Sequence, residues 1–149
     1  MNIILVRYAE VGLKSPGVRR HFETILIDNM EAALARKRIE ALVNCEQGRI
    51  YVRTDRIDDA AAELSHVFGI ASVSPAIECG SDMAEMQSVA AELSRSVIGQ
   101  GMSFAVKARR EGTHPYTSME VGKEVGSAIF LANQDREARV DLTRPDVIM

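Results

Sequence analysis

Aromatic side chains and cysteines are both scarce in this chain of 149 residues. It contains no Trp, its aromatic fraction is 5%, and it has two cysteines. A core without aromatic bulk must be built from aliphatic side chains and Ala. Cys45 and Cys79 are far apart in the sequence, with no C-x-x-C pair and no cluster of His. This excludes a zinc ribbon and argues against a disulfide-stapled secreted domain, so we expect a reduced, cytoplasmic protein.

Long hydrophobic runs are missing as well. Runs such as Ile3–Val6 are far shorter than the roughly 20 residues that a membrane-spanning helix needs. The opening segment alternates like a strand and is interrupted by Arg7 and Glu10, which is not the pattern of a signal peptide. We therefore expect no membrane association.

Catalytic signatures are also absent. The sequence has no G-x-x-x-x-G-K-[ST], no G-x-G-x-x-G after a strand, no H-E-x-x-H and no nucleophile elbow. His21, His66 and His114 are scattered, and isolated histidines are most often surface or packing residues. We expect no catalytic residue, no metal site and no cofactor in this chain.

The net charge of −3 conceals an uneven distribution. Residues 1–56 hold ten Lys or Arg against seven Asp or Glu, residues 57–106 hold one against seven, and residues 107–149 hold seven of each. Fourteen of the 18 cations are Arg, whose guanidinium binds phosphate oxygens in a fork. Because binding depends on the local field, a mildly acidic chain can still carry a basic surface for nucleic acid. The alternative is that these arginines only solvate helix and strand surfaces.

Residues 1–79 have the pattern of one small domain. Strands are predicted over 2–8, 41–45, 49–53 and 70–78, with helices over 16–38 and 55–68. This β-α-β-β-α-β order is typical of a ferredoxin-like sandwich, an antiparallel four-stranded sheet with two helices on one face. Ser15 and Asp55 are the predicted N-caps. Apolar spacing predicts the buried side of each helix: Val18, Phe22, Ile25, Asn29, Ala32 and Ala33 in the first, and Ile57, Ala61, Leu64 and Phe68 in the second.

Residues 80–149 have the pattern of a second, α/β domain. A D-x-x-E pattern at Asp82 and a T-x-x-E pattern at Thr117 begin two helices, and strands are predicted over 102–110 and 138–142. Val147-Ile148-Met149 begins a further apolar segment, which needs a sheet partner. We therefore expect this domain to be incomplete at its carboxyl end, within an overall α+β fold.

The clearest binding pattern lies between the predicted strand 102–110 and the helix after it. On a strand, Lys107 and Arg109 share one face, with their charged heads roughly 7 Å apart, about one phosphate spacing. A loop with a stackable ring follows, and then a helix N-terminus with N–H donors. Together these suit a nucleic-acid backbone or a single-stranded end, whereas the alternative is an exposed strand beside a well-capped helix. The candidate residues are Lys107, Arg109, Arg110, His114, Tyr116, Thr117 and Ser118.

A second cluster of cations surrounds the start of the first helix. Lys14 precedes the predicted cap, and Arg19 and Arg20 occupy the first turn. Cations oppose the helix dipole there, which favours an anionic partner. Glu10 or Glu23 could instead neutralise them.

Two groups of short motifs resemble one family. I-L-V-R-Y-A-E at 4–10, with L-K-S at 13–15, Arg19, Phe22 and Asn29, resembles the amino terminus of tRNA 4-thiouridine synthetases, also called tRNA sulfurtransferases. F-A-V-K-A-R-R at 104–110 resembles their THUMP domain, as do H-P at 114–115, S-M-E at 118–120, V-D-L at 140–142 and P-D-V at 145–147. The resemblance spans the chain, with both groups in the family's order.

The resemblance implies a ferredoxin-like domain over 1–79 and an incomplete THUMP domain over 80–149. Together they would hold the acceptor arm of tRNA, with the THUMP domain at the 3′ CCA end. A separate PP-loop domain, in cis or in trans, would use ATP to convert uridine 8 to 4-thiouridine. Its S-G-G-x-D-S loop is absent here, so ATP is expected only in that domain. A link to thiamine biosynthesis is implied as well, and a homodimer is left open.

Three other interpretations remain. THUMP domains also accompany RNA methyltransferases and deaminases, and a stand-alone THUMP adaptor can present tRNA to an acetyltransferase. A ferredoxin-like regulator that senses a small molecule would bind a metabolite and no RNA.

Overall fold

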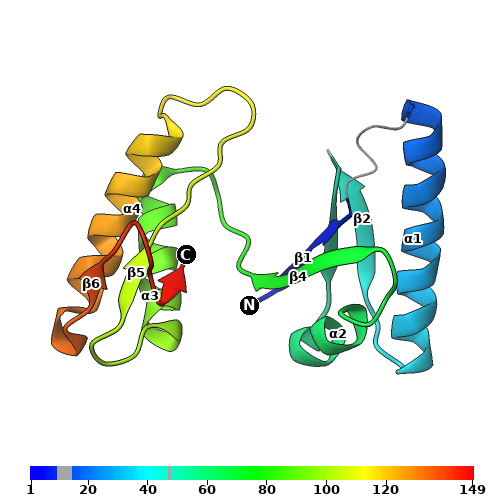
Figure 1. Cartoon of the computed structure of the whole chain (residues 1–149), viewed down its shortest axis with the longest axis horizontal. Helices are drawn as coiled ribbons and strands as arrows, with labels where there is room; N and C mark the ends of the chain where they lie inside the picture. The colour runs from blue at the N-terminus through cyan, green and yellow to red at the C-terminus, as the bar shows by residue number, and fades with distance from the viewer. Residues whose placement is uncertain (10–14, 47) are drawn as a thin grey trace. The chain divides into compact units, whose positions relative to one another are not determined.

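The computed structural model describes residues 1–9, 15–46 and 48–149, which divide into two compact units (Figure 1). The first unit is Met1–Glu78 and the second is Cys79–Met149. Each unit has its own sheet and its own buried cluster.

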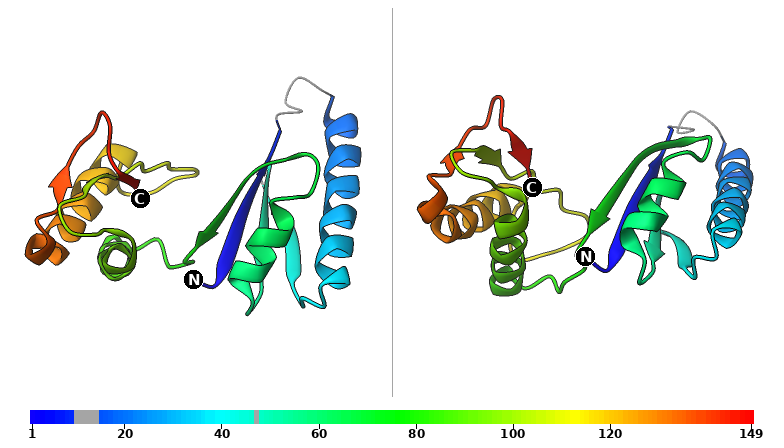
Figure 2. Two further views of the ribbon diagram at one scale, coloured as in Figure 1. Left: turned by 60° about the horizontal axis from the view of Figure 1, so that its bottom comes forward. Right: turned by 90° about the horizontal axis from the view of Figure 1, so that it is seen from below.

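The first unit is a β-α-β-β-α-β sandwich, as the sequence predicts. Its sheet has the antiparallel order β2-β3-β1-β4, which puts β1 and β3 in the centre. The two helices lie on one side of this sheet (Figure 2). The elements are β1 (Ile3–Tyr8), α1 (Pro16–Arg36), β2 (Leu42–Glu46), β3 (Arg49–Arg53), α2 (Ile57–Leu64) and β4 (Ile70–Ala76).

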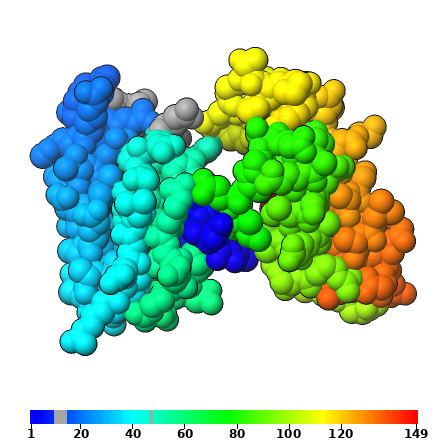
Figure 3. All heavy atoms as spheres, turned by 180° about the vertical axis from the view of Figure 1, so that it is seen from behind, coloured from blue at the N-terminus to red at the C-terminus, as the bar shows by residue number. Residues whose placement is uncertain are grey.

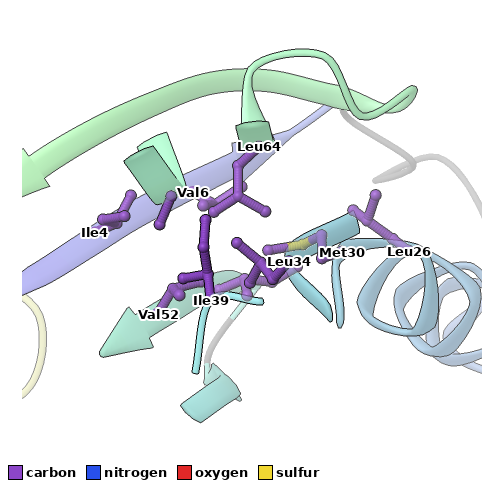
Figure 4. Packing of buried hydrophobic residues seen from close by; sticks show 10 residues of the cluster. Ile4, Val6, Leu26, Met30, Leu34, Ile39, Val52 and Leu64 are labelled. Atoms are coloured by element: carbon purple, nitrogen blue, oxygen red, sulfur yellow. The ribbon is translucent and has the colours of Figure 1, made fainter. Parts of the chain in front are cut away.

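The core of the first unit lies between the sheet and the helices (Figure 4). Alternate residues of the central strands, such as Ile4 and Val52, point toward the helix layer and are fully buried. Met30 and Leu34 of α1 meet them from the other side. The aliphatic core expected from the shortage of aromatic residues is therefore present.

The buried side of α1 matches the prediction only in part: Ala33 is buried and Phe22 packs against the core, as predicted. Leu26, Met30 and Leu34 are buried, whereas Val18 and Ile25 are about half exposed. Both sets have helical spacing, so α1 carries two apolar stripes, and contact with the sheet selects one of them. The N-cap position is Ser15, with Pro at the start of the helix as predicted, but no side-chain hydrogen bond caps it.

The second helix is shorter than predicted, and its predicted last core residue is exposed. α2 ends at Leu64, where a tight turn closed by Val67 N–H donating to the Leu64 carbonyl leads into β4. Phe68 follows that turn and is 95% exposed, so its assignment to the core was wrong. The N-cap is Arg56 rather than Asp55, again without a side-chain cap.

The second unit is a three-stranded parallel sheet with two helices. The sheet order is β6-β5-β7. The helices α3 and α4 pack against each other (Figure 2). Phe104, Val125 and Ile129 lie in its buried cluster. The elements are α3 (Met83–Val97), β5 (Ser103–Ala105), α4 (Ser118–Ala132), the 3-10 turn η1 (Gln134–Arg136), β6 (Arg139–Val140) and β7 (Val147–Ile148).

The predicted strand 102–110 is only three residues long. β6 pairs with Ser103 and Phe104, and the chain then turns away at Asp141, whose carboxylate accepts hydrogen bonds from the N–H groups of Thr143 and Arg144. Without a neighbour on that side, the segment after Ala105 is not part of the regular sheet, although Lys107 N–H still donates to the Met149 carbonyl at 2.9 Å.

Candidate nucleic-acid interface

The start of α4 is fixed by a reciprocal cap, as predicted. The Thr117 hydroxyl accepts from Glu120 N–H at 3.1 Å, and the Glu120 carboxylate accepts from Thr117 N–H at 2.7 Å. The Thr117 hydroxyl is thus engaged within the helix terminus. Ser118, one residue later, lines a surface groove.

The loop before α4 is organised by its own side chains. The Arg110 guanidinium donates to the Tyr116 carbonyl at 3.3 Å and to the His114 carbonyl at 3.5 Å. The His114 and Tyr116 rings stack with centroids 5.3 Å apart, and the Tyr116 hydroxyl donates to the Ser81 carbonyl at 2.6 Å. The loop stands at one end of the second unit (yellow in Figure 3). These three predicted residues therefore come together around the loop.

The two cations predicted on one strand face remain on the surface, although the strand ends before them. Lys107 and Arg109 are exposed, whereas the residue before each of them, Val106 and Ala108, is half-buried. Arg109 lies 3.5 Å from Glu111, but its side chain is 77% exposed. An ion pair so open to water is worth little, and leaves the guanidinium accessible.

A large groove runs between α4, β6 and the segment after β5. Its volume is about 1110 Å³, and its floor is mostly apolar. Lys107 and Lys123 are the charged residues of its lining, and no acidic residue lines it among those that the structure describes. The lining residues are Phe104, Val106, Lys107, Ala108, Ser118, Met119, Gly122, Lys123, Gly126, Ser127, Phe130, Leu131, Val140 and Leu142.

Small residues on α4 shape this groove. A Cβ atom on Gly126 would lie 3.7 Å from the Val106 side chain, and one on Gly122 would lie 3.9 Å from the Val106 carbonyl. Val106 therefore lies close to the backbone of α4. Because Gly122 and Gly126 have no side chains, they leave the groove open along this part of the helix. Met119, 84% exposed, and Leu131, 65% exposed, flank it.

The groove contains two of the predicted residues and several that the prediction missed. Lys107 and Ser118 line it, whereas Arg109, Arg110, His114 and Tyr116 do not. Lys123 was missed, although a signal existed. Met119, Lys123 and Phe130 recur at helical spacing on one side of α4, apart from the buried Val125 and Ile129.

The predicted cations of the first unit are only partly engaged. Lys14 lies outside the described residues. Arg19 forms an ion pair with Glu23 at 3.3 Å. The Glu23 carboxylate also accepts a hydrogen bond from the Tyr8 hydroxyl. Burial and that hydrogen bond raise the pKa of Tyr8. Glu23 therefore offsets charge at the start of α1, while Arg20 is exposed, and phosphate binding by these residues stays a prediction.

Both units match known domain families. Residues 3–74 match the model of the ThiI ferredoxin-like domain, and residues 80–149 match that of the THUMP domain. A probable tRNA sulfurtransferase of Methanosarcina acetivorans is 41% identical over 97% of this chain and 36% of its own length. A probable tRNA sulfurtransferase of Methanosarcina mazei is 37% identical, again over 97% of this chain and 36% of its own length. The chain thus spans about 36% of the length of these curated relatives.

Two solved structures share the fold over the whole chain. PH1313 from Pyrococcus horikoshii Ot3 superimposes with a TM-score of 0.84 at 33% identity, covering 100% of this chain and 51% of that one. A 4-thiouridine synthetase, solved in complex with RNA and with bound ATP, superimposes with a TM-score of 0.79 at 26% identity, covering 99% and 37%.

The chain therefore consists of a ThiI-type ferredoxin-like domain followed by a THUMP domain. Within that class the chain belongs to the tRNA sulfurtransferase family. None of the helices in the described ranges is long and apolar enough to cross a membrane.

Proposed function

We propose that this chain is the tRNA-binding region of a tRNA sulfurtransferase, and that the groove of the second unit holds the unpaired 3′ CCA end. The acceptor arm would thereby be positioned so that uridine 8 is converted to 4-thiouridine by a PP-loop domain, in cis or in trans. The observation that carries this proposal is the groove itself, which combines an apolar floor with two lysines and no acidic lining residue.

This combination fits a single strand better than a duplex. Unpaired bases expose flat apolar faces that can lie on side chains such as Met119 and Phe130, while the phosphates need cations at the rim. Lys107 and Lys123 supply those cations, and neither ammonium forms an ion pair with another described residue. The exposed Arg109 adjoins the same segment and extends the positive potential.

The relatives support the tRNA part of the proposal by name, and one similar protein was solved with RNA. We place ATP only in the catalytic domain of the longer protein. From the family we also propose that the protein is cytoplasmic and that it has a link to thiamine biosynthesis. A homodimer remains part of this proposal.

The test is a binding titration of the chain with full-length tRNA, tRNA without CCA, and an acceptor-stem minihelix. We expect loss of CCA to weaken binding roughly tenfold or more, because each stacked base contributes about 1–3 kcal/mol. The minihelix should retain most of the affinity. Equal affinity for tRNA with and without CCA would contradict placement of the 3′ end in the groove.

Substitutions within the groove sharpen this test. Lys107→Ala and Lys123→Ala should each reduce the slope of log affinity against log salt by about 0.7–0.9, the value for one lost phosphate contact. Arg144→Ala is the matched control, because this exposed cation belongs to the same unit but does not line the groove. A slope that is unchanged in both lysine variants would remove the groove from the RNA interface.

A further inference from the structure

The sheet of the first unit has one face without helices. Successive side chains of a strand point to opposite faces of the sheet. Every second one, such as Val6 of β1 and Ile50 of β3, lies in the core. The others therefore point to the opposite face, away from α1 and α2. On the two central strands these outward residues include Leu5 and Arg7 of β1, and Arg49, Tyr51 and Arg53 of β3.

Strand register brings a ring and two cations together on this face. Leu5 pairs with Tyr51 and Val6 pairs with Ile50, which is the last pair of the β1–β3 ladder, and Arg7 and Arg49 lie one residue beyond it on their strands. Tyr51 is half-buried on the same face.

Arg7 has neutral partners. Its guanidinium donates to the hydroxyls of Ser72 and Ser74 on β4, at 3.4 and 3.3 Å, and no acidic group pairs with it in the part of the chain that the structure describes. The acids of this face lie at its periphery: Glu78 pairs with Arg53 at 2.7 Å, and Glu46 lies opposite Arg49 on the outer strand β2. Arg7 and Tyr51 therefore form its central, cationic part.

We infer that this face is a second RNA site, which binds an unpaired nucleotide with its base on the Tyr51 ring and its phosphate on Arg7. Single-stranded RNA is recognised on four-stranded sheets by stacking of bases on aromatic side chains, and arginine supports such stacking through its charge. Ser72 and Ser74 orient the Arg7 guanidinium toward this face. The inference rests on the proposed RNA-binding function but places a contact on the other unit.

The test uses Tyr51→Leu and Arg7→Gln in the full chain, with an oligouridine strand as the probe. To isolate this face, both are made in the background of Lys107→Ala and Lys123→Ala. We expect Tyr51→Leu to weaken oligouridine binding about fivefold or more, as one lost stack predicts. Arg7→Gln should lower the salt slope by about 0.7, the single-strand value for one phosphate.

Matched controls lie on the helix side of the same unit. Phe68→Leu removes an exposed aromatic ring, and Arg36→Gln removes an exposed cation, both outside the sheet face. They should leave affinity and salt slope unchanged. The inference is overturned if Tyr51→Leu binds like its parent, or if Phe68→Leu weakens binding equally. Thermal melts of each variant verify that the unit remains folded.

A photocrosslink gives an independent readout. After ultraviolet irradiation with tRNA and digestion by trypsin, a nucleotide adduct should appear on the peptide 50–53, which contains Tyr51, and should vanish in Tyr51→Leu. Absence of this adduct while the chain binds tRNA overturns the sheet-face site and leaves the proposed function standing. Failure of the unsubstituted chain to bind tRNA would instead contradict the proposed function. The oligouridine titrations of Tyr51→Leu and Arg7→Gln would then test the sheet-face site without tRNA.

Discussion

The two units use their apolar residues differently. The first unit encloses them between a four-stranded sheet and two helices, with residues such as Met30 and Val52 fully buried. The second has a smaller buried cluster and leaves Met119 and Leu131 largely exposed along a groove with two lysines. Contiguous apolar surface on a protein commonly marks a binding site. The comparison indicates that the apolar side chains of the groove serve binding more than folding.

The largest expected effect tests this division directly. Leu34→Ala in the first unit should lower the free energy of unfolding by about 2–5 kcal/mol, because it opens a cavity in a closed core. Leu131→Ala in the groove should change it by less than about 0.5 kcal/mol. Hydrogen exchange in urea, resolved by unit, measures both. Comparable losses would show that the groove side chains are part of the fold.

Helix caps provide a second contrast of intermediate size. Thr117→Ala should cost about 0.5–2 kcal/mol, because it removes a hydroxyl that accepts from Glu120 N–H. Ser15→Ala should cost much less, because the Ser15 side chain makes no capping hydrogen bond. Thermal unfolding of the two variants gives the comparison. Equal destabilisation would mean that the reciprocal cap of α4 adds nothing to the stability of the second unit.

The smallest effect concerns the pH dependence of the second unit. Hydrogen bonds donated by the Ser103 N–H, at 2.8 Å, and by its hydroxyl lower the pKa of Asp146 below its usual 3.8. Because the folded pKa is depressed, this stabilisation is present above pH 3.8 and is lost as pH falls through the folded value.

Asp146→Asn should therefore lower the melting temperature near neutral pH, and the difference from the unsubstituted chain should shrink in acid. Melting curves between pH 7 and pH 3 measure it. A difference that stays constant over this range would exclude the carboxylate charge as its source.

Local signals in the sequence were sufficient for the element order and for two helix starts. Asp82 and Thr117 cap α3 and α4 through hydrogen bonds that span three residues, so the sequence pattern contains the interaction. The length of β5 could not be predicted in this way. Residues after Ala105 keep an alternation of exposed and half-buried side chains, but a strand also needs a neighbour, and β6 ends where Asp141 turns the chain.

The candidate site was predictable to a similar extent. Lys107 and Ser118 lie in one short stretch of sequence, which pointed to the right place on the second unit. Lys123, Leu131 and Val140 reach the groove from α4 and β6, and only the packing of these elements shows that they face it. The sheet face with Arg7 and Tyr51 likewise depends on strand register between distant segments.

The sequence by itself determined the class of fold, the family and the caps of α3 and α4, because each depends on residue types at short, fixed spacings. Tertiary structure decided which stripe of α1 is buried and that Phe68 is exposed. It also decided where apolar residues and lysines line a common groove. The physical reason is that a helix with two apolar stripes, or a strand with an alternating pattern, is compatible with more than one partner. Burial against a particular neighbour selects among them.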